Sequence, residues 1–477
     1  MKERLIVQEL VDFIDNKDSV CPVALISGIR RIGKTTVLKQ LASKYNDAVY
    51  IDMLSSKDGF AELYDRFLNN PTSLLLIDEI TYLNEYDDML AQTLYEMAAG
   101  EKGWRFKCII TGSSPAHMMK LQRYRLGGGR SKLFRLLPIT FIEYLHFTER
   151  ISDYTKIGDV TANDFINYLK LEGLQPDLRI VFDREYFETY YNETLSSNEN
   201  SRLNASQIDI SPNELLALTD LLAYKLSEAI AYAKMLSPEV GKQELINVNQ
   251  AGANLKWGRL DLSEALLSVS AAKQKSLSVE TKIRIINFLL NSGLAVFETV
   301  NDGVDDPLDA HSLMRSLNHL GTHEDLASLF KNCSLHMVTP LFYSRLGEDI
   351  VNRMGIDLSY LYQGALLGKM LEVYVKGALS LYSPSLLLSS IKLSSSENGE
   401  VDVFLPYEML MCEVTVGNKK FANINVNNYF RDKLVIRICS TKSVEDFING
   451  MHRIPYAKLC ALIDTKQVLN LEKTTVS

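Results

Sequence analysis

The chain lacks the features that would mark it as secreted or membrane-bound. No stretch of eighteen apolar residues occurs in it, which argues against a conventional membrane-spanning helix. Its first five residues carry both signs of charge and no apolar core, so we predict no signal peptide. Six cysteines are scattered over 477 residues without a CxxC pair, which predicts reduced, buried thiols. We therefore expect a cytoplasmic protein with no membrane partner.

An excess of positive charge is also missing. The 51 Lys and Arg residues are outnumbered by 59 Asp and Glu residues, and the formal net charge is −8. A global electrostatic footprint for nucleic acid is therefore not visible, although the count does not exclude local basic patches. With 46% hydrophobic and 23% charged residues, the composition is that of a folded globular protein, and the length predicts two or three domains.

What the chain does contain is a complete P-loop pattern at residues 28–35. Residues 22–27 predict a short buried strand before it, and residues 34–45 predict a helix after it. Glycine at both ends of the loop lets the backbone adopt left-handed angles and turn its N–H groups around phosphate. Lys34 would place a positive charge at the β- and γ-phosphates, and Thr35 would bind Mg²⁺. The expected ATP-binding residues are Gly28, Ile29, Arg30, Arg31, Ile32, Gly33, Lys34, Thr35 and Thr36.

Two further apolar strands end in polar residues. The first, at residues 73–77, is followed by Asp78, predicted to hold Mg²⁺ through water, and by Glu79, predicted to polarise the attacking water. The second, at residues 107–111, leads to Ser113, which would orient that water or sense the γ-phosphate. The neighbouring Ser114 predicts a helix N-cap, and the two roles are compatible. We expect these residues at the ligand-binding edge of a parallel sheet.

In this order the motifs resemble the AAA-type ATPases of bacteria and archaea. The resemblance also includes Gly129-Arg130 and the run at residues 137–144, and it covers roughly the first 150 residues strongly. It implies an N-terminal ATPase domain followed by a domain of restriction-nuclease-like fold. By this resemblance Arg130 is a phosphate sensor or a finger that acts on a neighbouring subunit, which would require a homo-oligomer. A flexible glycine loop and a basic surface are the alternatives for Arg130.

The rest of the chain is expected to be α/β with a helical middle. Aromatic residues between 161 and 191 are expected to pack in a core rather than to stack on bases. The segment at 278–298 resembles a winged helix, and its helix has only Lys282 and Arg284 as basic residues, which favours packing over DNA binding. The predicted parts are an ATPase domain at 1–150, a helical lid and linker at 151–210, a winged-helix-like domain at 211–345 and a degenerate nuclease-like α/β domain at 346–477.

The C-terminal part predicts a long helix followed by three strands, a further helix and another strand. That order resembles the core of restriction-type nucleases, and Glu372, Asp402 and Glu413 take the places of Mg²⁺ ligands. The lysine expected two residues after Glu413 is Thr415 instead. Binding or regulation by this fold is therefore favoured over cleavage.

Three other sets of polar residues in the sequence do not predict a further catalytic or metal-binding site. Lys419 and Lys420 would replace the missing lysine only from a loop with favourable geometry. His319 and His323 flank a glycine and lack the acidic neighbour of a zinc protease motif. The acidic run at 302–309 lacks the calcium-loop pattern and predicts a solvated loop.

Together these motifs predict an ATP-binding protein that is a magnesium-dependent ATPase. We expect it to act as a nucleotide-driven switch on a protein or DNA partner. The alternative is an ATP-regulated, metal-dependent DNA nuclease that uses the C-terminal domain. A module that binds ATP without turnover is a third interpretation.

Overall fold

The chain divides into two compact units, which are described separately. Unit 1 comprises Met1–Ile139, Glu185–Pro212 and Asn287–Gly293, and unit 2 comprises Thr140–Arg184, Asn213–Ile286 and Leu294–Ser477. No helix in the described part of the chain is long and apolar enough to cross a membrane. The computed structural model describes residues 2–16, 22–53, 55, 74–82, 107–122, 126, 131–179, 212–235, 262–267, 277–301, 313, 316–317, 319–382, 387–393, 399–405, 410–414, 435–440, 445–448 and 451–471.

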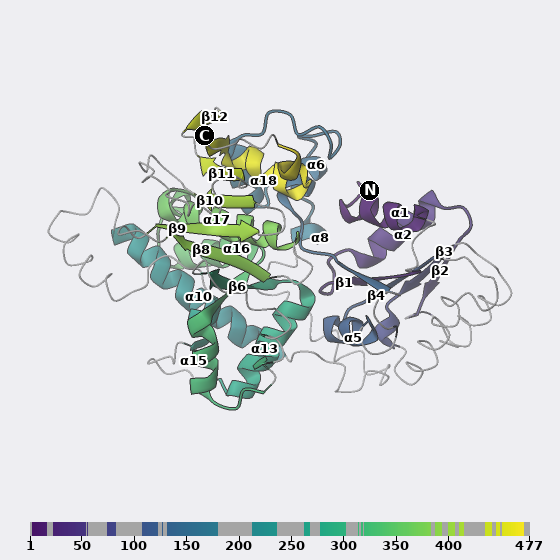
Figure 1. The fold of residues 1–477 in the computed structure, drawn as a ribbon, viewed down its shortest axis with the longest axis horizontal. Coiled ribbons are helices and arrows are strands. Elements are labelled where there is room, and N and C mark those ends of the chain that lie inside the picture. Colours follow the sequence, from purple (N-terminus) through teal and green to yellow (C-terminus); the bar gives the residue numbers. More distant parts are fainter. Residues whose placement is uncertain are drawn as a thin grey trace. The chain divides into compact units, whose positions relative to one another are not determined.

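Unit 1 is built on a five-stranded parallel sheet with the strand order β2-β3-β4-β1-β5 (Figure 1). Its elements are α1 (Ile6–Asp15), β1 (Val23–Ser27), α2 (Lys34–Lys44), β2 (Ala48–Asp52), β3 (Leu74–Asp78), the 3₁₀ helix η1 (Ile80–Tyr82), β4 (Lys107–Gly112), α5 (Pro115–Lys120) and β5 (Ser131–Arg135).

Helices cover both faces of this sheet. Every residue of β1 and β3 is buried, as expected for parallel strands covered on both sides. Helices α1 and α2 lie over one face and α5 lies over the other (Figure 1). The side chains on the α5 face form a continuous apolar core that includes Val23, Leu25, Leu75, Ile77, Cys108, Ile110, Met118 and Leu121. The α/β class and the strands predicted around the P-loop are confirmed.

Unit 2 contains an eight-stranded mixed sheet with the order β12-β13-β11-β10-β9-β8-β6-β7. Its strands are β6 (Ala295–Asn301), β7 (Cys333–Met337), β8 (Leu387–Leu393), β9 (Gly399–Leu405), β10 (Leu410–Val414), β11 (Val435–Ser440), β12 (Asp446–Ile448) and β13 (Met451–Pro455). Its helices are α6 (Phe141–Phe147), α7 (Ala162–Leu169), α8 (Pro176–Arg179), α12 (Leu262–Leu267), α15 (His323–Asn332), α16 (Leu341–Arg353), η6 (Leu358–Tyr362), α17 (Gly364–Ser380), α18 (Tyr456–Asp464) and η7 (Gln467–Asn470). Helix α10 (Pro212–Met235) belongs to unit 2 except for Pro212, and α13 (Val279–Ser292) is divided, with residues 287–292 assigned to unit 1.

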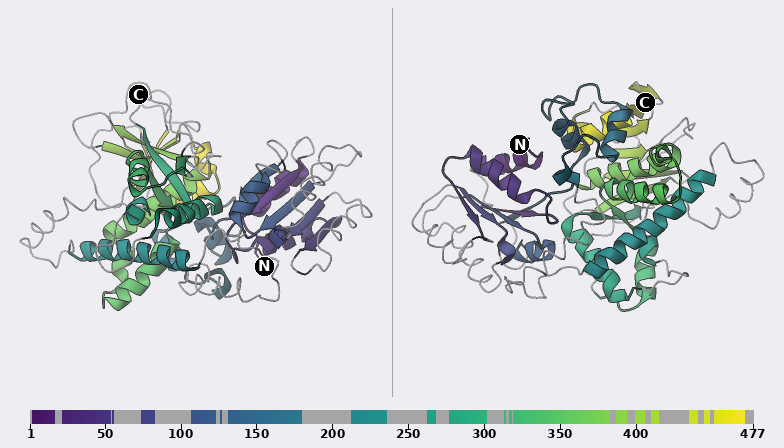
Figure 2. Two further views of the ribbon diagram at one scale, coloured as in Figure 1. Left: turned by 90° about the horizontal axis from the view of Figure 1, so that it is seen from below. Right: turned by 180° about the vertical axis from the view of Figure 1, so that it is seen from behind.

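The strand expected to complete a small winged-helix unit belongs to this large sheet instead. β6 pairs antiparallel with β7 and parallel with β8, and α17 packs against the strands from β6 to β10 (Figures 1 and 2). The physical reason is that Ala295, Val296 and Phe297 are all buried, so the strand needs cover on both faces. One sheet therefore runs across the boundary predicted between residues 345 and 346.

Aromatic side chains form the core around α6 and α7 in unit 2. Phe165 and Tyr168 are fully buried. The ring of Phe165 meets those of Phe141, Tyr374 and Tyr456 edge-on, at centroid distances of 5.2, 5.4 and 5.6 Å. Such edge-to-face pairs add to the burial of large apolar area. The expectation of packing is confirmed for Phe165 and Tyr168, whereas the aromatic residues from 182 to 191 lie outside the described residues.

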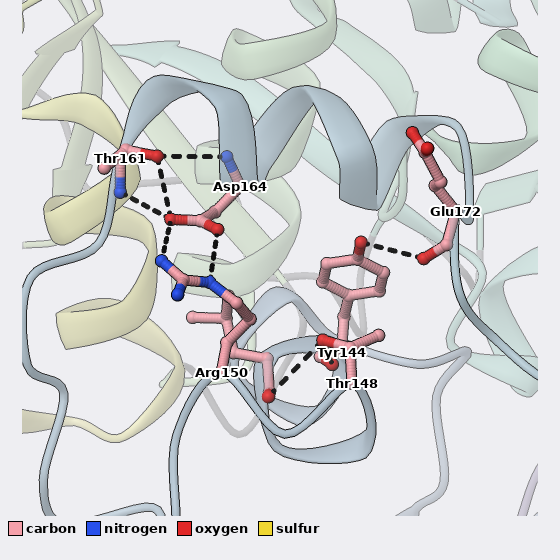
Figure 3. Close-up of polar contacts among 7 residues, drawn as sticks. Tyr144, Thr148, Arg150, Thr161, Asp164 and Glu172 are labelled. Atoms are coloured by element: carbon pink, nitrogen blue, oxygen red, sulfur yellow. Dashed lines mark hydrogen bonds and ion pairs between the residues drawn. The ribbon is translucent and has the colours of Figure 1, made fainter.

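Polar contacts fix the start of α7 within the same unit (Figure 3). Thr161 and Asp164 form a capping box, in which the Thr161 N–H and hydroxyl both donate to Asp164 Oδ2 at 2.8 Å. The Arg150 Nε donates to Asp164 Oδ1 at 2.7 Å. Burial raises the pKa of Asp164, but the Arg150 and Thr161 hydrogen bonds outweigh it and leave the pKa below its usual value. Nearby, the Tyr144 hydroxyl donates to the Glu172 carbonyl at 2.9 Å.

Candidate functional site

The P-loop lies between β1 and α2, at the carboxyl edge of the unit 1 sheet. Lys34 is the first residue of α2, and its side chain is buried. Its ammonium group bends back over the loop and donates to the Gly28 carbonyl at 2.8 Å and to the Ile29 carbonyl at 2.9 Å. The loop thus encloses the ammonium group of its own lysine.

The two loop glycines are required for different reasons. Gly33 is the N-cap of α2 and has a φ of 101°, so the predicted left-handed conformation is confirmed there. Gly28 is not among the left-handed residues of the described chain, and its requirement is space. A Cβ at Gly28 would lie 2.6 Å from the Leu136 carbonyl oxygen. Arg31 is also left-handed, with a φ of 59°, a strained conformation that the sequence does not reveal.

Asp78 ends β3 and is held by two hydroxyl groups. The Thr111 hydroxyl donates to Asp78 Oδ1 at 2.5 Å, and the Tyr50 hydroxyl donates to Asp78 Oδ2 at 2.8 Å. These donors come from β4 and β2, the strands on either side of β3. The carboxylate is only 4% exposed, so these bonds fix its orientation in a site with little water to compete for it.

Glu79 follows directly and has a φ of 57°. Its backbone N–H donates to the Thr111 hydroxyl at 3.1 Å. Its side-chain Oε1 accepts from both the N–H and the hydroxyl of Ser113, each at 2.8 Å, and from the Thr81 hydroxyl. All of these side-chain contacts reach one oxygen, which anchors the carboxylate beside β4. The Thr111 hydroxyl links the two acidic residues, because it donates to the Asp78 carboxylate and accepts from the Glu79 backbone N–H.

The electrostatics of the site follow from burial and from these two acids. Burial, with a smaller contribution from the charge of Arg30, lowers the pKa of Lys34 to about 8 against the opposing charges of Glu79 and Asp78. Burial also raises the pKa of Tyr50, and its hydrogen bond to Asp78 adds to the effect. Tyr50 is therefore a neutral donor at physiological pH. One cation and two carboxylates influence one another across the edge of the sheet.

The remaining predicted residues of unit 1 are placed as follows. Thr35 and Arg31 are exposed, and Thr36 and Arg30 are partly buried. Ser114 caps α5, because its hydroxyl accepts from the His117 N–H at 3.2 Å with Pro115 in the first turn. Arg130 lies outside the described residues. The sequence analysis did not identify Tyr50 and gave Thr111 no role. Thr111 could have been identified, because it is a polar residue at the carboxyl end of a predicted strand, where ligands bind in parallel sheets.

Glu372, one of the predicted acids of the C-terminal part, pairs with a buried lysine. Lys376, one helical turn after Glu372 on α17, contacts Glu372 Oε1 at 2.9 Å and Glu298 Oε1 of β6 at 3.0 Å. His336 contacts Glu298 Oε2 at 2.5 Å. Lys369 contacts Glu372 Oε2 at 2.6 Å. Glu298 and Lys376 are each 3% exposed, so this is a charge cluster inside unit 2 rather than on its surface.

Asp402 and Glu413 lie on neighbouring strands of the same sheet. β9 and β10 pair antiparallel, with Val403 opposite Cys412. The next position along this register therefore brings Asp402 opposite Glu413. Asp402 Oδ2 accepts from the Val414 N–H at 2.7 Å. Burial and the charge of Glu372 raise the pKa of Asp402 well above its usual value.

The assignment of Glu372, Asp402 and Glu413 as Mg²⁺ ligands stays a prediction. No group of three or more His, Cys, Asp and Glu residues within the described ranges is placed to hold a metal ion. Of these acids, Glu372 pairs with Lys376 and Lys369. Thr415, Lys419 and Lys420 lie outside the described residues. The sequence offered one signal for the Glu372–Lys376 pair. Residues four apart share a helix face, so their spacing predicts an ion pair on a helix.

The AAA domain family model matches residues 21–145. No curated protein matched the chain. Solved structures similar to it include replication initiator DnaA bound to AMPPCP and single-stranded DNA, at 15% identity over 59% of this chain and 82% of that chain, with a TM-score of 0.25. AMPPCP-bound DnaA from Aquifex aeolicus has 17% identity, coverage of 53% and 88%, and a TM-score of 0.24. Cdc6p from Pyrobaculum aerophilum has 16% identity, coverage of 69% and 95%, and a TM-score of 0.25.

At these TM-scores the three likenesses carry no conclusion about the overall fold or the partners of this chain. The family match is different, because it coincides with the P-loop and the acidic strand end described above. It spans well under half of the chain, so it identifies a domain and not the whole protein. Residues 21–145 form an AAA-type P-loop domain.

Proposed function

We propose that unit 1 binds ATP with Mg²⁺ and hydrolyses it to ADP and phosphate. The observation that carries this proposal is the meeting of three features at one sheet edge. They are the P-loop with the buried Lys34, the paired acids Asp78 and Glu79, and the hydroxyl residues at the end of β4. A buried cation opposite two acids is the arrangement that phosphoryl transfer needs, since charge must be stabilised on one side and water activated on the other.

Each residue has a defined task in this proposal. Lys34 exchanges its carbonyl partners for the β- and γ-phosphate oxygens, which its short swing from Gly28 and Ile29 permits. Glu79, anchored through Oε1, turns Oε2 toward the attacking water and accepts its proton. Ser113 holds that carboxylate in place.

The residues present also fit a magnesium ion. Thr35 stands in the first turn of α2, and Asp78 is an oriented carboxylate, which are the oxygen donors that Mg²⁺ prefers. When bound, Mg²⁺ would neutralise charge on the β- and γ-phosphates. Arg30, Arg31 and Ile32 would line the phosphate side of the loop, and Arg130 remains a proposed sensor or finger from this chain or from a second copy.

Phosphate release from ATP by the full chain tests this proposal. We expect release that requires Mg²⁺ and is lost in Lys34→Ala, because Lys34 carries the buried charge that is proposed to bind the β- and γ-phosphates. The matched control is Lys44→Ala, which removes a lysine from the last turn of the same helix, where it pairs with Glu3 at 2.9 Å on the surface. Equal release by Lys34→Ala and the wild type would contradict the proposal.

We also expect ATP affinity to fall at alkaline pH. Phosphate binds the ammonium form of Lys34, whose pKa is lowered to about 8 by burial. Above that pH binding must take up a proton, so the apparent affinity should drop about tenfold between pH 7 and pH 9. Calorimetry in two buffers of different ionisation enthalpy, at constant ionic strength, would measure both the drop and the proton uptake. An affinity that is equal at pH 7 and pH 9 would refute this role of Lys34.

The use of the ATP cycle is proposed to be a switch that acts on a protein or DNA partner. Measuring phosphate release with and without plasmid DNA distinguishes the two partner classes, because a DNA partner should accelerate release. We do not propose the nuclease alternative, since no observation favours it. Glu372, one of the predicted metal ligands, pairs instead with Lys376, which also pairs with Glu298.

A further inference from the structure

Arg4 is a buried cation that no sequence motif includes. Only 6% of it is exposed. Its Nη1 donates to the Ile32 carbonyl at 2.9 Å, and its Nη2 donates to the Leu137 carbonyl at 2.8 Å. One guanidinium group thus joins the P-loop to a segment more than one hundred residues away, within unit 1.

The segment around Leu137, which accepts from Arg4 Nη2, is fixed by its own contacts with β1 and the P-loop. The preceding Leu136 donates its N–H to the Ser27 carbonyl at 2.8 Å, which extends the pairing of β5 with β1. The Leu136 carbonyl lies so close to Gly28 that a Cβ there would be 2.6 Å from it. The segment that receives Nη2 is therefore packed against the base of the P-loop.

The Ile32 end of the bridge is the strained part of the loop. Ile32 stands between Arg31, with a φ of 59°, and Gly33, with a φ of 101°. A non-glycine residue in this conformation persists only where its surroundings hold it. A Cβ at Gly33 would meet Arg4 Nη1 at 3.6 Å, so the guanidinium lies directly against this turn.

The peptide bond from Ile32 to Gly33 transmits this contact. In a trans peptide the C=O and the N–H point in opposite directions. Because Arg4 draws the Ile32 carbonyl toward itself, the Gly33 N–H must point away from Arg4. That N–H is one of the loop donors that would face a phosphate.

The segment before α1 fixes Arg4 in turn. The Lys2 carbonyl, two residues before Arg4, accepts from Gln40 Nε2 at 2.8 Å. Gln40 is on α2, the helix that begins with the P-loop lysine. The segment that carries Arg4 is thus held by the same helix.

We propose that Arg4 is a positioning residue for ATP binding, which holds the Ile32–Gly33 peptide with its N–H toward the phosphates. This inference rests on the proposed ATP binding and adds a residue outside the motif. The guanidinium is suited to it because its fork reaches two carbonyls at once, whereas a lysine ammonium is a single point donor.

Calorimetric titration of the full chain with Mg²⁺ and ATP tests the inference. Arg4→Met keeps an unbranched apolar stem and removes every side-chain donor, and it should weaken ATP binding by on the order of tenfold to a hundredfold. Arg4→Lys keeps the charge and can satisfy one carbonyl, so its affinity should lie between those of Arg4→Met and the wild type. The matched control is Arg150→Met, which removes the guanidinium that binds Asp164 in unit 2 and should bind ATP as the wild type does.

Each variant is titrated well below its own melting temperature. If Arg4→Met does not fold, the affinity of Arg4→Lys tests the inference. Unchanged ATP affinity in Arg4→Lys overturns the inference, and weakened affinity supports it. A lowered melting temperature with wild-type affinity in Arg4→Met would show a structural role only and would overturn it. If the wild type itself does not bind ATP, the proposed function fails, and this result is distinct from failure of the Arg4 inference alone.

Discussion

Replacing Glu79 with glutamine should lower the rate of ATP turnover by on the order of 10² to 10⁴, as expected when a general base is removed. Glutamine preserves the shape and can still accept from Ser113 and Thr81 through its carbonyl oxygen, so the loop should keep its geometry. What is lost is the negative charge that accepts the proton from water. Phosphate release under saturating ATP measures the effect.

ATP binding by the same variant separates chemistry from affinity. We expect Glu79→Gln to retain ATP binding, since Lys34 and Asp78 are still present, with an affinity altered only through loss of the Glu79 charge that raises the pKa of Lys34. Ser113→Ala is the graded control, because it removes the hydroxyl donor to Glu79 Oε1 and leaves the backbone N–H donor. Its turnover should fall less than that of Glu79→Gln. Wild-type turnover by Glu79→Gln would remove Glu79 from the catalytic step.

Replacing Lys376 with methionine should destabilise unit 2 by about 3–5 kcal/mol, the usual cost of breaking a buried ion pair by removing one partner. Burial lowers the pKa of Lys376, but the charges of Glu372 and Glu298 outweigh this and raise it above its usual value. The lysine is therefore charged and balances two carboxylates. Urea unfolding followed by circular dichroism measures the loss.

Lys369→Met is the matched control for this prediction. Lys369 pairs with the same Glu372, but its side chain is 33% exposed, so solvent screens the pair and its loss should cost under about 1 kcal/mol. The double variant Glu298→Gln with Lys376→Met should recover part of the stability lost in Lys376→Met, because one buried charge is removed with its partner. Equal stability of Lys376→Met and Lys369→Met would contradict the buried-cluster account.

The geometry of the candidate site could be predicted because the sequence signals for it are local. A glycine-rich loop between a strand and a helix, and acids at the end of an apolar strand, are each contained in a few consecutive residues. Lys34, Asp78 and Glu79 could therefore be assigned to one sheet edge from the order of strands alone. Their proposed roles in binding and hydrolysis still await the experiments above.

What the sequence could not supply is pairing across long separations. Lys376 and Glu298 are 78 residues apart, and Arg4 and Leu137 are 133 residues apart. No spacing rule connects such residues, because their contact depends on how sheets and helices pack. The assignment of β6 to the eight-stranded sheet was missed for the same reason, since its partner β8 lies far along the chain.

The central claim is that the P-loop of unit 1 holds ATP through the buried charge of Lys34. The most direct measurement is a calorimetric titration of the full chain with ATP and Mg²⁺ at pH 7.5, beside Lys34→Ala and the surface control Lys44→Ala. We predict one ATP bound per chain in the wild type and in Lys44→Ala, and no measurable binding in Lys34→Ala. Absence of binding in the wild type, or equal binding in Lys34→Ala, would contradict the claim.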